Sequence, residues 1–259
     1  MKASYENSTI AIAVAKCSDF ARTSIQHNLD NSECNLLVIY DENTPEDYVV
    51  NDRVKYIKNN AGRNFPKILN QLIDNIDTEY IIYVNWRLRP SKENHLLAFE
   101  KLNEGYGLID LNSPLLYTAF SKHLITKIGM FDERYVGGHC VDWDMVYNLK
   151  FYNIAHYNVN VCAYDHSLAT PNNPTYTTWF ANDPVNINNY KEFHKKWQKE
   201  TDKVLKNLSE VNINAKQKYK NVYEERKYLP STESETCYDW VQEILDAKIV
   251  DAQKLTFKI

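Results

Sequence analysis

Residues 64–84 read NFPKILNQLIDNIDTEYIIYV. Asn64 is a preferred helix N-cap, and Pro66 suits the first turn of the helix that follows. The apolar residues then recur with the spacing of one helix face, at Phe65, Ile68, Leu69, Leu72, Ile73 and Ile76. An apolar strand, Tyr80–Val84, follows directly. A helix that leads straight into an apolar strand is typical of α/β proteins.

The same alternation of strands and helices extends toward the N-terminus. A helical segment that begins after Ser18 follows the first of the apolar, strand-like runs. These runs cover residues 9–16, 35–40 and 54–57. Strands separated by helices form mostly parallel sheets that are covered on both faces, and ligands bind at the carboxyl ends of such strands. We therefore expect the loops after Ala15, Tyr40 and Val84 to form a binding site.

The second half of the chain is less regular. We expect strands at residues 106–111, 117–121 and 157–164, and helices at residues 122–128 and 144–153. Residues 168–188 contain three prolines and many Asn and Thr residues, which indicates a long loop. Phe193 and Trp197 then fall on one face of an amphipathic helix, and Trp240–Leu245 suggests a last one. The predicted organisation is a main domain, residues 1–185, and a helical extension, residues 186–259, that packs on it.

Composition excludes several classes of protein. The chain has 259 residues with 30 Lys+Arg and 34 Asp+Glu, an ordinary globular balance. No apolar run reaches the roughly 18 residues that a membrane-spanning helix needs, so we expect a cytoplasmic protein, in the host cytoplasm if the source is viral. With only 6 glycines the chain has neither a P-loop nor a GxGxxG pattern, which argues against classical kinases and dinucleotide-dependent dehydrogenases. The 5 cysteines form no CxxC pair, so neither a zinc site nor a disulfide framework is indicated.

One block carries a resemblance to a known family. Residues 128–135 read IGMFDERY and residues 141–144 read VDWD. Together they resemble the "GxFDE…EDxD" region of the nucleotide-sugar-dependent glycosyltransferases of the GT-A fold, family 2 in particular. Weaker marks fall in the expected order, at residues 41–42, 60–62, 166–167 and 193–197. The resemblance covers residues 8–200 and implies a GT-A-like, Rossmann-like α/β fold with a mostly parallel sheet flanked by helices and a helical C-terminal extension.

The chain departs from the family at its metal site. Where the family has a metal-binding DxD motif after the fourth strand, this sequence has Asn85-Trp86-Arg87, and the usual aspartate aligns with Arg87. Hard cations need oxygen ligands, which a guanidinium does not offer. We therefore predict no required cofactor and no protein metal ligand, and we expect at most a weak dependence on Mn²⁺ or Mg²⁺.

The resemblance implies two candidate catalytic residues. It makes Asp142 the base that takes a proton from the acceptor hydroxyl. The alternative is a loop carboxylate that caps a helix beginning near Asp144. For Asp144 itself we expect helix capping or acceptor orientation, and for Asp132 and Glu133 a structural role in a turn.

The candidate donor-binding residues lie in the predicted loops. Asp41 would accept hydrogen bonds from the base or ribose of the nucleotide. Arg87 and Arg89 would clamp the diphosphate, although solvated surface charge is an equal alternative. His166 would contact the diphosphate, be a surviving metal ligand or make a structural hydrogen bond. Lys196 would reach the site from its helix. The full predicted set is Ala15, Asp41, Asn60, Arg63, Asn85, Arg87, Arg89, His166 and Lys196.

Three functions remain open at this point. The first is an inverting hexosyl- or pentosyltransferase that moves a sugar from a nucleotide-sugar donor, UDP-linked in most of the family, to a glycan or lipid-linked glycan. The second is a phage-type enzyme that glycosylates hydroxymethylated bases of DNA. The third is a nucleotide- or sugar-binding module without catalysis, which the missing DxD motif motivates.

Overall fold

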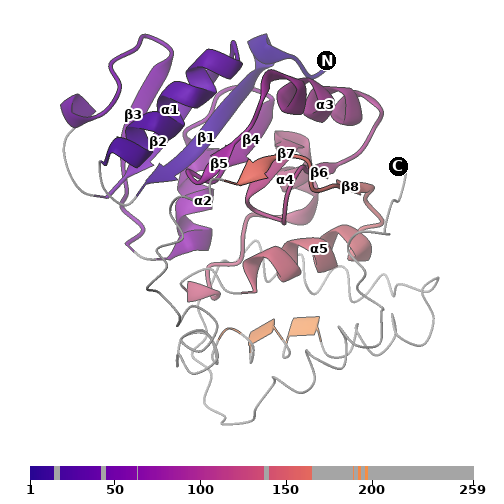
Figure 1. The fold of residues 1–259 in the computed structure, drawn as a ribbon. Helices are drawn as coiled ribbons and strands as arrows, with labels where there is room; N and C mark the ends of the chain where they lie inside the picture. The colour runs from indigo at the N-terminus through magenta and orange to yellow at the C-terminus, as the bar shows by residue number, and fades with distance from the viewer. Residues whose placement is uncertain are drawn as a thin grey trace.

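The computed structural model describes residues 1–14, 18–41, 45–62, 64–136 and 140–164, together with residues 189, 192, 193, 196 and 197. Their centre is a seven-stranded sheet with the order β3-β2-β1-β4-β7-β6-β8 (Figure 1). Its strands are β1 (Ser8–Val14), β2 (Asn35–Tyr40), β3 (Val54–Lys58), β4 (Tyr80–Val84), β6 (Leu108–Asp110), β7 (Tyr117–Ser121) and β8 (His156–Asn158). Two short strands, β5 (Leu88–Arg89) and β9 (Ala163–Tyr164), pair outside it.

The strands run mostly in one direction. β3, β2, β1 and β4 pair in parallel, β7 is antiparallel to both β4 and β6, and β8 is parallel to β6. β4 and β6 therefore point the same way, so the carboxyl ends of six of the seven strands share one edge of the sheet. The predicted fold class, a mostly parallel sheet flanked by helices, is confirmed.

Helices cover both faces of the sheet. They are α1 (Asp19–Asn31), α2 (Phe65–Asp74), α3 (Lys92–Asn103), α4 (Lys122–Ile128) and α5 (Val141–Phe151), with 3₁₀ turns at Tyr5–Asn7 and Pro45–Asp47. One buried cluster joins α1 and α3 to alternate strand residues such as Ile10, Val38 and Ile82. The other joins α2, α4 and α5 to the residues between them, such as Ala11 and Ile81. Because successive side chains of a strand point to opposite faces of the sheet, each strand contributes to both cores, as expected for a sheet covered on both faces.

Several predicted elements are confirmed with their bounds. β2, β4, β7 and α4 begin and end where the apolar pattern indicates. α2 begins after Asn64, whose side chain accepts a hydrogen bond from the Lys67 N–H. The predicted strand at residues 157–164 is instead two short strands, because the N–H groups of Val161 and Cys162 both donate to the Leu111 carbonyl, just after β6, and so interrupt the strand pairing. α3 and β5 were not predicted.

The predicted start of the helix at residue 144 is wrong. α5 begins at Val141, because Cys140 is its N-cap and the carbonyl of Cys140 accepts the first helical hydrogen bond from the Asp144 N–H, at 2.9 Å. Cys140 takes a left-handed conformation with φ of 71°, which turns the chain sharply into the helix. Asp142 thus lies in the first helical turn and not in a loop.

The C-terminal part is described only at five buried residues. Asn189, Glu192, Phe193, Lys196 and Trp197 are all helical, with the spacing of a single helix face. The predicted loop at residues 168–188 and the predicted helix near residue 240 lie outside the described residues, and the domain boundary at residue 185 stays a prediction. None of the helices described is both long enough and apolar enough to span a bilayer.

Candidate active site

A cavity of about 240 Å³ opens at the carboxyl ends of the parallel strands. This is the edge at which open α/β sheets bind their ligands. Strand ends, the start of α2 and the turn after β4 all contribute to its wall. The lining residues are Ala13, Val14, Ile39, Asp41, Asn59, Phe65, Ile68, Tyr83, Asn85 and Trp86. Apolar walls with a few polar groups at the rim are typical of small-molecule sites.

Two side chains pair at the rim of the cavity. Asp41 follows β2 and Asn59 follows β3, and the Asn59 amide donates to the Asp41 carboxylate and to the Gly62 carbonyl. The side-chain oxygen of Asn59, Oδ1, in turn accepts a hydrogen bond from the Ala61 N–H at 2.7 Å. These bonds orient the carboxylate of Asp41, which is exposed and has acceptor positions left for a ligand. The sequence indicated Asp41 but not Asn59.

Asn60 lies elsewhere. Its N–H donates to the Gln71 side chain at 3.0 Å, and the residue lines a separate cavity of about 370 Å³ beside α2. The prediction of Asn60 rests on the resemblance of residues 60–62 to the family and stays a prediction, whereas the residue that lines the cavity at the strand ends is Asn59, the first residue after β3. A search for the first polar residue after each strand end would have found Asn59, but only if the strand end had been known.

The segment after β4 forms a tight turn. The Asn85 side chain accepts the Arg87 N–H at 3.1 Å, and the Asn85 carbonyl accepts the Leu88 N–H at 2.8 Å. The Arg87 guanidinium stacks on the Trp86 ring, 5.3 Å from its centroid. Arg89 instead donates two hydrogen bonds of 2.9 Å to the carbonyls of Trp86 and Leu88. Arg89 therefore holds the turn, and the Arg87 guanidinium lies over Trp86, one of the residues that line the cavity.

The donor set of this turn does not fit a divalent cation. Asn85-Trp86-Arg87 contributes one amide oxygen and a positive charge, where a cation would need several oxygen ligands. Among the residues that the structure describes, no group of three His, Cys, Asp or Glu side chains has the arrangement of a metal site. The positive charge at this turn comes from the guanidinium of Arg87 itself.

Asp142 occupies the first turn of α5 and is partly buried. Burial raises the pKa of its carboxyl to about 6, the backbone N–H groups of Trp143 and Asp142 oppose this rise, and the negative charge of Asp110 adds to it. Because the N-cap is Cys140, the alternative in which Asp142 caps the helix is wrong. A carboxylate with this pKa is ionised at neutral pH and is a stronger base than an ordinary aspartate.

Asp110, whose charge contributes to the pKa shift of Asp142, lies in the central sheet. Asp110 is the last residue of β6 and lies at the carboxyl edge of the sheet that also carries the cavity. Its carboxylate accepts hydrogen bonds from the Thr118 hydroxyl and, at 2.7 Å, from Nε2 of His156. Asp142 interacts electrostatically with Asp110, and the residues that line the cavity at the strand ends do not include Asp142.

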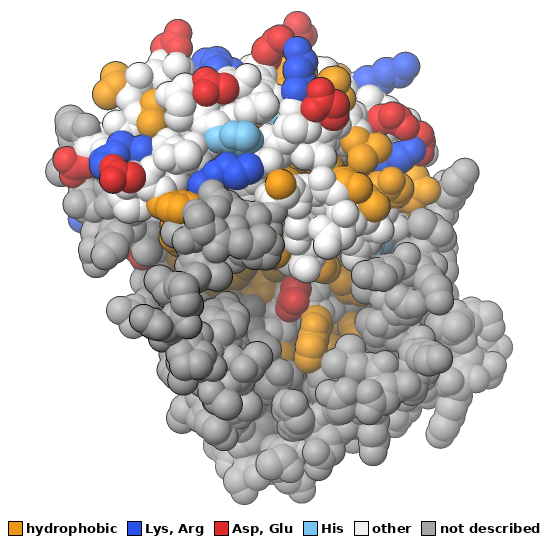
Figure 2. All heavy atoms as spheres, viewed as in Figure 1, with side chains coloured by type: hydrophobic (Ala, Val, Ile, Leu, Met, Phe, Trp, Pro, Cys, Tyr) orange, Lys and Arg blue, Asp and Glu red, His pale blue; other side chains and the backbone are white. Residues whose placement is uncertain are grey.

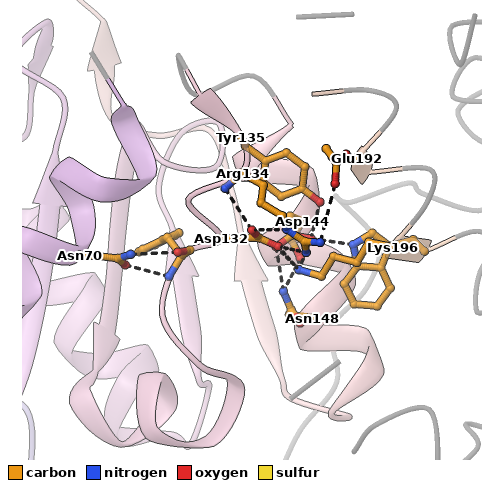
Figure 3. A network of polar contacts seen from close by, with 10 residues as sticks. Asn70, Asp132, Arg134, Tyr135, Asp144, Asn148, Glu192 and Lys196 are labelled. Atoms are coloured by element: carbon orange, nitrogen blue, oxygen red, sulfur yellow. Dashed lines mark hydrogen bonds and ion pairs between the residues drawn. The ribbon is translucent and has the colours of Figure 1, made fainter. Parts of the chain in front are cut away.

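Asp144 points into the protein interior. Its side chain is 3% exposed and accepts from Tyr135 Oη, Asn148 Nδ2, Lys196 Nζ and Trp197 Nε1 (Figure 3). Both carboxylate oxygens are thus occupied by protein donors. This arrangement favours a structural role over catalysis for Asp144, and it does not cap the helix. Its assignment as a catalytic residue stays a prediction.

Lys196 is buried between two carboxylates. Nζ lies 3.1 Å from Asp132 Oδ2 and 2.8 Å from Asp144 Oδ1, and the side chain is 1% exposed. A side chain held this way has little freedom to reach a nucleotide, so the predicted donor contact gains no support from its geometry. Of the other predicted residues, Ala15, Arg63 and His166 lie outside the described residues.

The FDE turn itself has a structural role, as expected. Asp132 accepts from the guanidinium of Arg134, and Glu133 Oε1 accepts from Asn70 at 2.9 Å. Asn70, on α2, also exchanges two hydrogen bonds of 2.9 Å with the backbone of Phe131. This buried asparagine therefore joins the helix beside the cavity to the loop that leads to Asp142.

No protein-family model matches the chain, and no curated protein matches it. Solved structures do. The mannosyltransferase PcManGT from Pyrobaculum calidifontis, in complex with GDP-Man and Mn²⁺, matches with a TM-score of 0.52 and 8% identity over 96% of this chain and 82% of that chain. GalNAc-T7 with UDP, GalNAc and Mn²⁺ matches with a TM-score of 0.58 and 9% identity over 95% of this chain and 58% of that chain. The fold is therefore that of the GT-A-type nucleotide-sugar transferases, as the resemblance implied.

Proposed function

We propose that this protein is an inverting glycosyltransferase that moves a hexose or pentose from a nucleotide-sugar, UDP-linked in our proposal, to an acceptor hydroxyl. The observation that carries the proposal is the cavity of about 240 Å³ at the carboxyl ends of the parallel strands, with the carboxylate of Asp41 among its lining. A fold shared with nucleotide-sugar transferases supports it. The pKa of about 6 at Asp142 supports a catalytic role over a binding module without catalysis.

Asp142 acts as the general base in this proposal. The acceptor oxygen attacks the anomeric carbon of the donor, and the proton of the hydroxyl passes to the Asp142 carboxylate. The new C–O bond forms on the face opposite the bond to the diphosphate, whose oxygen departs with the bonding electron pair as a nucleoside diphosphate. Attack from the opposite face inverts the anomeric configuration.

The nucleoside binds in the cavity. Asp41, oriented by Asn59, accepts a hydrogen bond from the N–H of the base or from a ribose hydroxyl, and uracil offers one such N–H. Apolar side chains from β2, α2 and β4, namely Ile39, Phe65 and Tyr83, surround the base. The two similar structures contain a guanosine and a uridine nucleotide, respectively, so the fold accommodates either base.

Arg87 meets the charge of the departing diphosphate. It follows the cavity residues Asn85 and Trp86, and it occupies the position at which the family has a metal-binding aspartate. A guanidinium offers two parallel donors to phosphate oxygens and remains charged at all physiological pH values. Ala15, Arg63 and His166 remain further proposed donor contacts.

The proposed acceptor is a hydroxyl of a glycan or a lipid-linked glycan. On the face drawn in Figure 2, acidic and basic side chains of the described residues lie interspersed. DNA binding draws on a continuous basic surface, because phosphate contacts dominate its affinity. The mixed charge of this face favours an uncharged acceptor over DNA.

The test is a panel of nucleotide-sugars, assayed for hydrolysis and for transfer with and without EDTA. We expect a UDP-sugar to be consumed, most activity to remain in EDTA, and the product to have the inverted anomeric configuration by NMR. Arg87→Ala should weaken donor binding or turnover by about 1.5 to 3 kcal/mol, the scale of a lost charged hydrogen bond. Turnover of no donor would contradict the proposal. Full loss of activity in EDTA with rescue by Mn²⁺ would contradict the role of Arg87. Salt-sensitive transfer to hydroxymethylated DNA would show that the acceptor is DNA and not a glycan.

A further inference from the structure

Five charged side chains are buried together beside α5 (Figure 3). We call Asp132, Arg134, Asp144, Glu192 and Lys196 the charged network. Each is at most 5% exposed. Three carboxylates therefore face two cations away from solvent. Such a set is expensive to desolvate, and it persists only when geometry and hydrogen bonds compensate each charge.

Lys196 is the centre of this network. Its Nζ atom contacts Asp132 from the FDE turn and Asp144 from α5 at the same time, at 3.1 and 2.9 Å. The neighbouring Trp197 donates from Nε1 to Asp144 Oδ1 at 2.6 Å. Two consecutive residues thus hold the same carboxylate, on the helix whose first turn carries Asp142.

A second set of contacts holds the FDE turn. Arg134 binds Asp132 through Nε at 2.8 Å and through Nη2, and its Nη1 lies 3.7 Å from Glu192 Oε2. Asn189 donates to the Val136 carbonyl at 2.7 Å. The helical residues between 189 and 197 that the structure describes therefore contact both the FDE turn and α5.

Aromatic contacts fix the same helix. Phe193 packs edge-on against Trp143 and Tyr147, with ring centroids 5.9 and 5.1 Å apart. Trp197 packs against Tyr147 and Phe151, at 5.5 and 5.8 Å. Trp143 is the residue directly after Asp142. The orientation of the first turn of α5 is thus determined from residues about fifty positions later in the chain, with Trp197 and Asp144 separated by 53 positions.

A strained residue precedes the proposed base. Cys140 has φ of 71°, a conformation that persists in a buried non-glycine residue only when the surrounding contacts require it. The charged network and the aromatic contacts are such contacts, because they hold the α5 residues that follow Asp142. Without them, α5 is free to relax this turn and to move the carboxylate of Asp142.

We propose that Lys196 and Trp197 are positioning residues for transfer: through Asp144 and Asp132 they fix the start of α5, so that the active site is complete only when this C-terminal face is docked. This inference rests on the proposed function through the role of Asp142. It assigns to Lys196 a task different from the donor contact predicted from the sequence.

Lys196→Met tests the inference, because it keeps the length of the side chain and removes the ammonium group. We expect kcat to fall by roughly 10- to 100-fold, the scale of a misplaced catalytic group, while KM for the donor stays within about twofold. Lys196→Arg, which keeps the charge, should recover part of kcat. Hydrogen exchange of the full chain should become faster in peptides covering residues 131–136 and 141–151 and stay unchanged in β1 and β2.

Lys101→Met is the matched control. Lys101 also bridges two carboxylates, Glu100 at 2.9 Å and Glu104 at 2.8 Å, but these are 60% and 44% exposed. This variant should keep kcat, KM and the exchange pattern. If Lys196→Met does not fold, Trp197→Phe serves in its place, because it removes only the donor to Asp144 and keeps an aromatic ring.

The outcomes separate this inference from the proposed function. Unchanged kcat in Lys196→Met, or a raised donor KM at unchanged kcat, overturns the positioning role, and the second result restores a donor contact. A wild-type protein that uses no donor overturns the proposed function. In that case faster exchange confined to residues 131–136 and 141–151 still supports docking, and unchanged or uniformly faster exchange overturns it.

Discussion

Polar side chains in the two halves of the sheet are used in opposite ways. In the half formed by β3, β2, β1 and β4, they follow strand ends: Asp41 is exposed, and Asn59 and Arg87 are half-buried, the first two at the cavity rim and the third in the turn after β4. In the half formed by β7, β6 and β8 with α5, they lie in the interior as the charged network. The first arrangement leaves acceptor positions on Asp41 for a ligand. In the second, charged side chains pair with one another within the protein, and in our proposal they position Asp142, whose pKa is raised by burial.

This comparison predicts what substitutions will cost. Changes at the cavity rim should weaken ligand binding and leave the folded state nearly as stable, because the side chains there are already partly solvated. Changes in the charged network should destabilise the folded state, because each removal leaves a buried charge without its partner. Asp142 belongs to neither class, since it lies beside the network without being bonded within it.

The largest expected effect is on transfer by Asp142→Asn. Removal of a general base typically lowers the rate by about 10² to 10⁴, and the amide keeps the shape of the side chain. Nucleotide binding by calorimetry should remain within about twofold, because the cavity rim is untouched. Steady-state rates of transfer measure the effect. A rate within about threefold of wild type would mean that the base is another residue.

The next effect is on stability. Arg134→Met should lower the free energy of unfolding by about 3 to 5 kcal/mol, because Asp132 and Glu192 would then be buried with one cation fewer. Burial works against the ionised form of Asp132, but Lys196 and Arg134 outweigh it and hold the pKa of that carboxyl well below its usual range. Urea unfolding measures the change.

Arg87→Ala is the control from the other half of the sheet. Its stability loss should stay below about 1 kcal/mol, the range for accessible positions. Equal losses in the two variants would break the comparison between an accessible rim and a buried network.

A smaller effect distinguishes two adjacent asparagines. Asn59→Ala should weaken nucleotide binding by about 1 kcal/mol, since the amide orients Asp41, whereas Asn60→Ala should leave it unchanged because Asn60 lines the cavity beside α2. Titration of UDP into the two variants measures the difference. Equal effects would mean that the cavity at the strand ends is not the nucleotide site.

The sequence predicted elements in both halves of the sheet where a local apolar pattern defines them, and it missed features that depend on contacts between residues distant in the chain. Apolar periodicity is local, so β2, β4 and the N-cap of α2 at Asn64 could be located without knowing the fold. Asn60 was chosen because residues 60–62 resemble a turn of the family, whereas the contact of Asn59 with Asp41 depends on the pairing of β2 with β3. α3 was missed because its inner face is only weakly apolar, with the buried polar residue His95 beside Ala98 and Phe99.

The charged network was out of reach for a different reason. Lys196 and Asp144 are 52 positions apart, and each alone has the pattern of a solvated charge or a site residue. Only the docking of the helical face at residues 189–197 on α5 makes them partners. The start of α5 was missed for a related reason, because the left-handed conformation of Cys140 has no signature in a residue that is not glycine or asparagine.

The smallest expected effect is the pH dependence of stability at Asp142. Its carboxyl has a pKa of about 6 in the folded protein, above the ordinary value of 3.8, so the folded state holds the proton more tightly than the unfolded chain does. Above pH 6 both states are ionised, and the folded state bears the cost of a partly buried charge.

Asp142→Asn removes this cost, and the sign of its effect therefore depends on pH. Above pH 6 the variant should be more stable than wild type by about 0.5 to 1 kcal/mol, less than the shift alone would give because the group is partly solvated. The gain should shrink as pH falls through 6 and vanish only below about pH 3.8, where the wild-type carboxyl becomes protonated in the unfolded chain as well. Thermal unfolding of both proteins across this range measures it. A carboxylate stabilised by protein partners, like Asp132, would give the opposite sign, with Asp132→Asn costing most at neutral pH. Opposite slopes for two carboxylates ten positions apart would thus separate a side chain kept basic for chemistry from one used to hold the fold, and a loss of stability in Asp142→Asn above pH 6 would place Asp142 with the charged network instead.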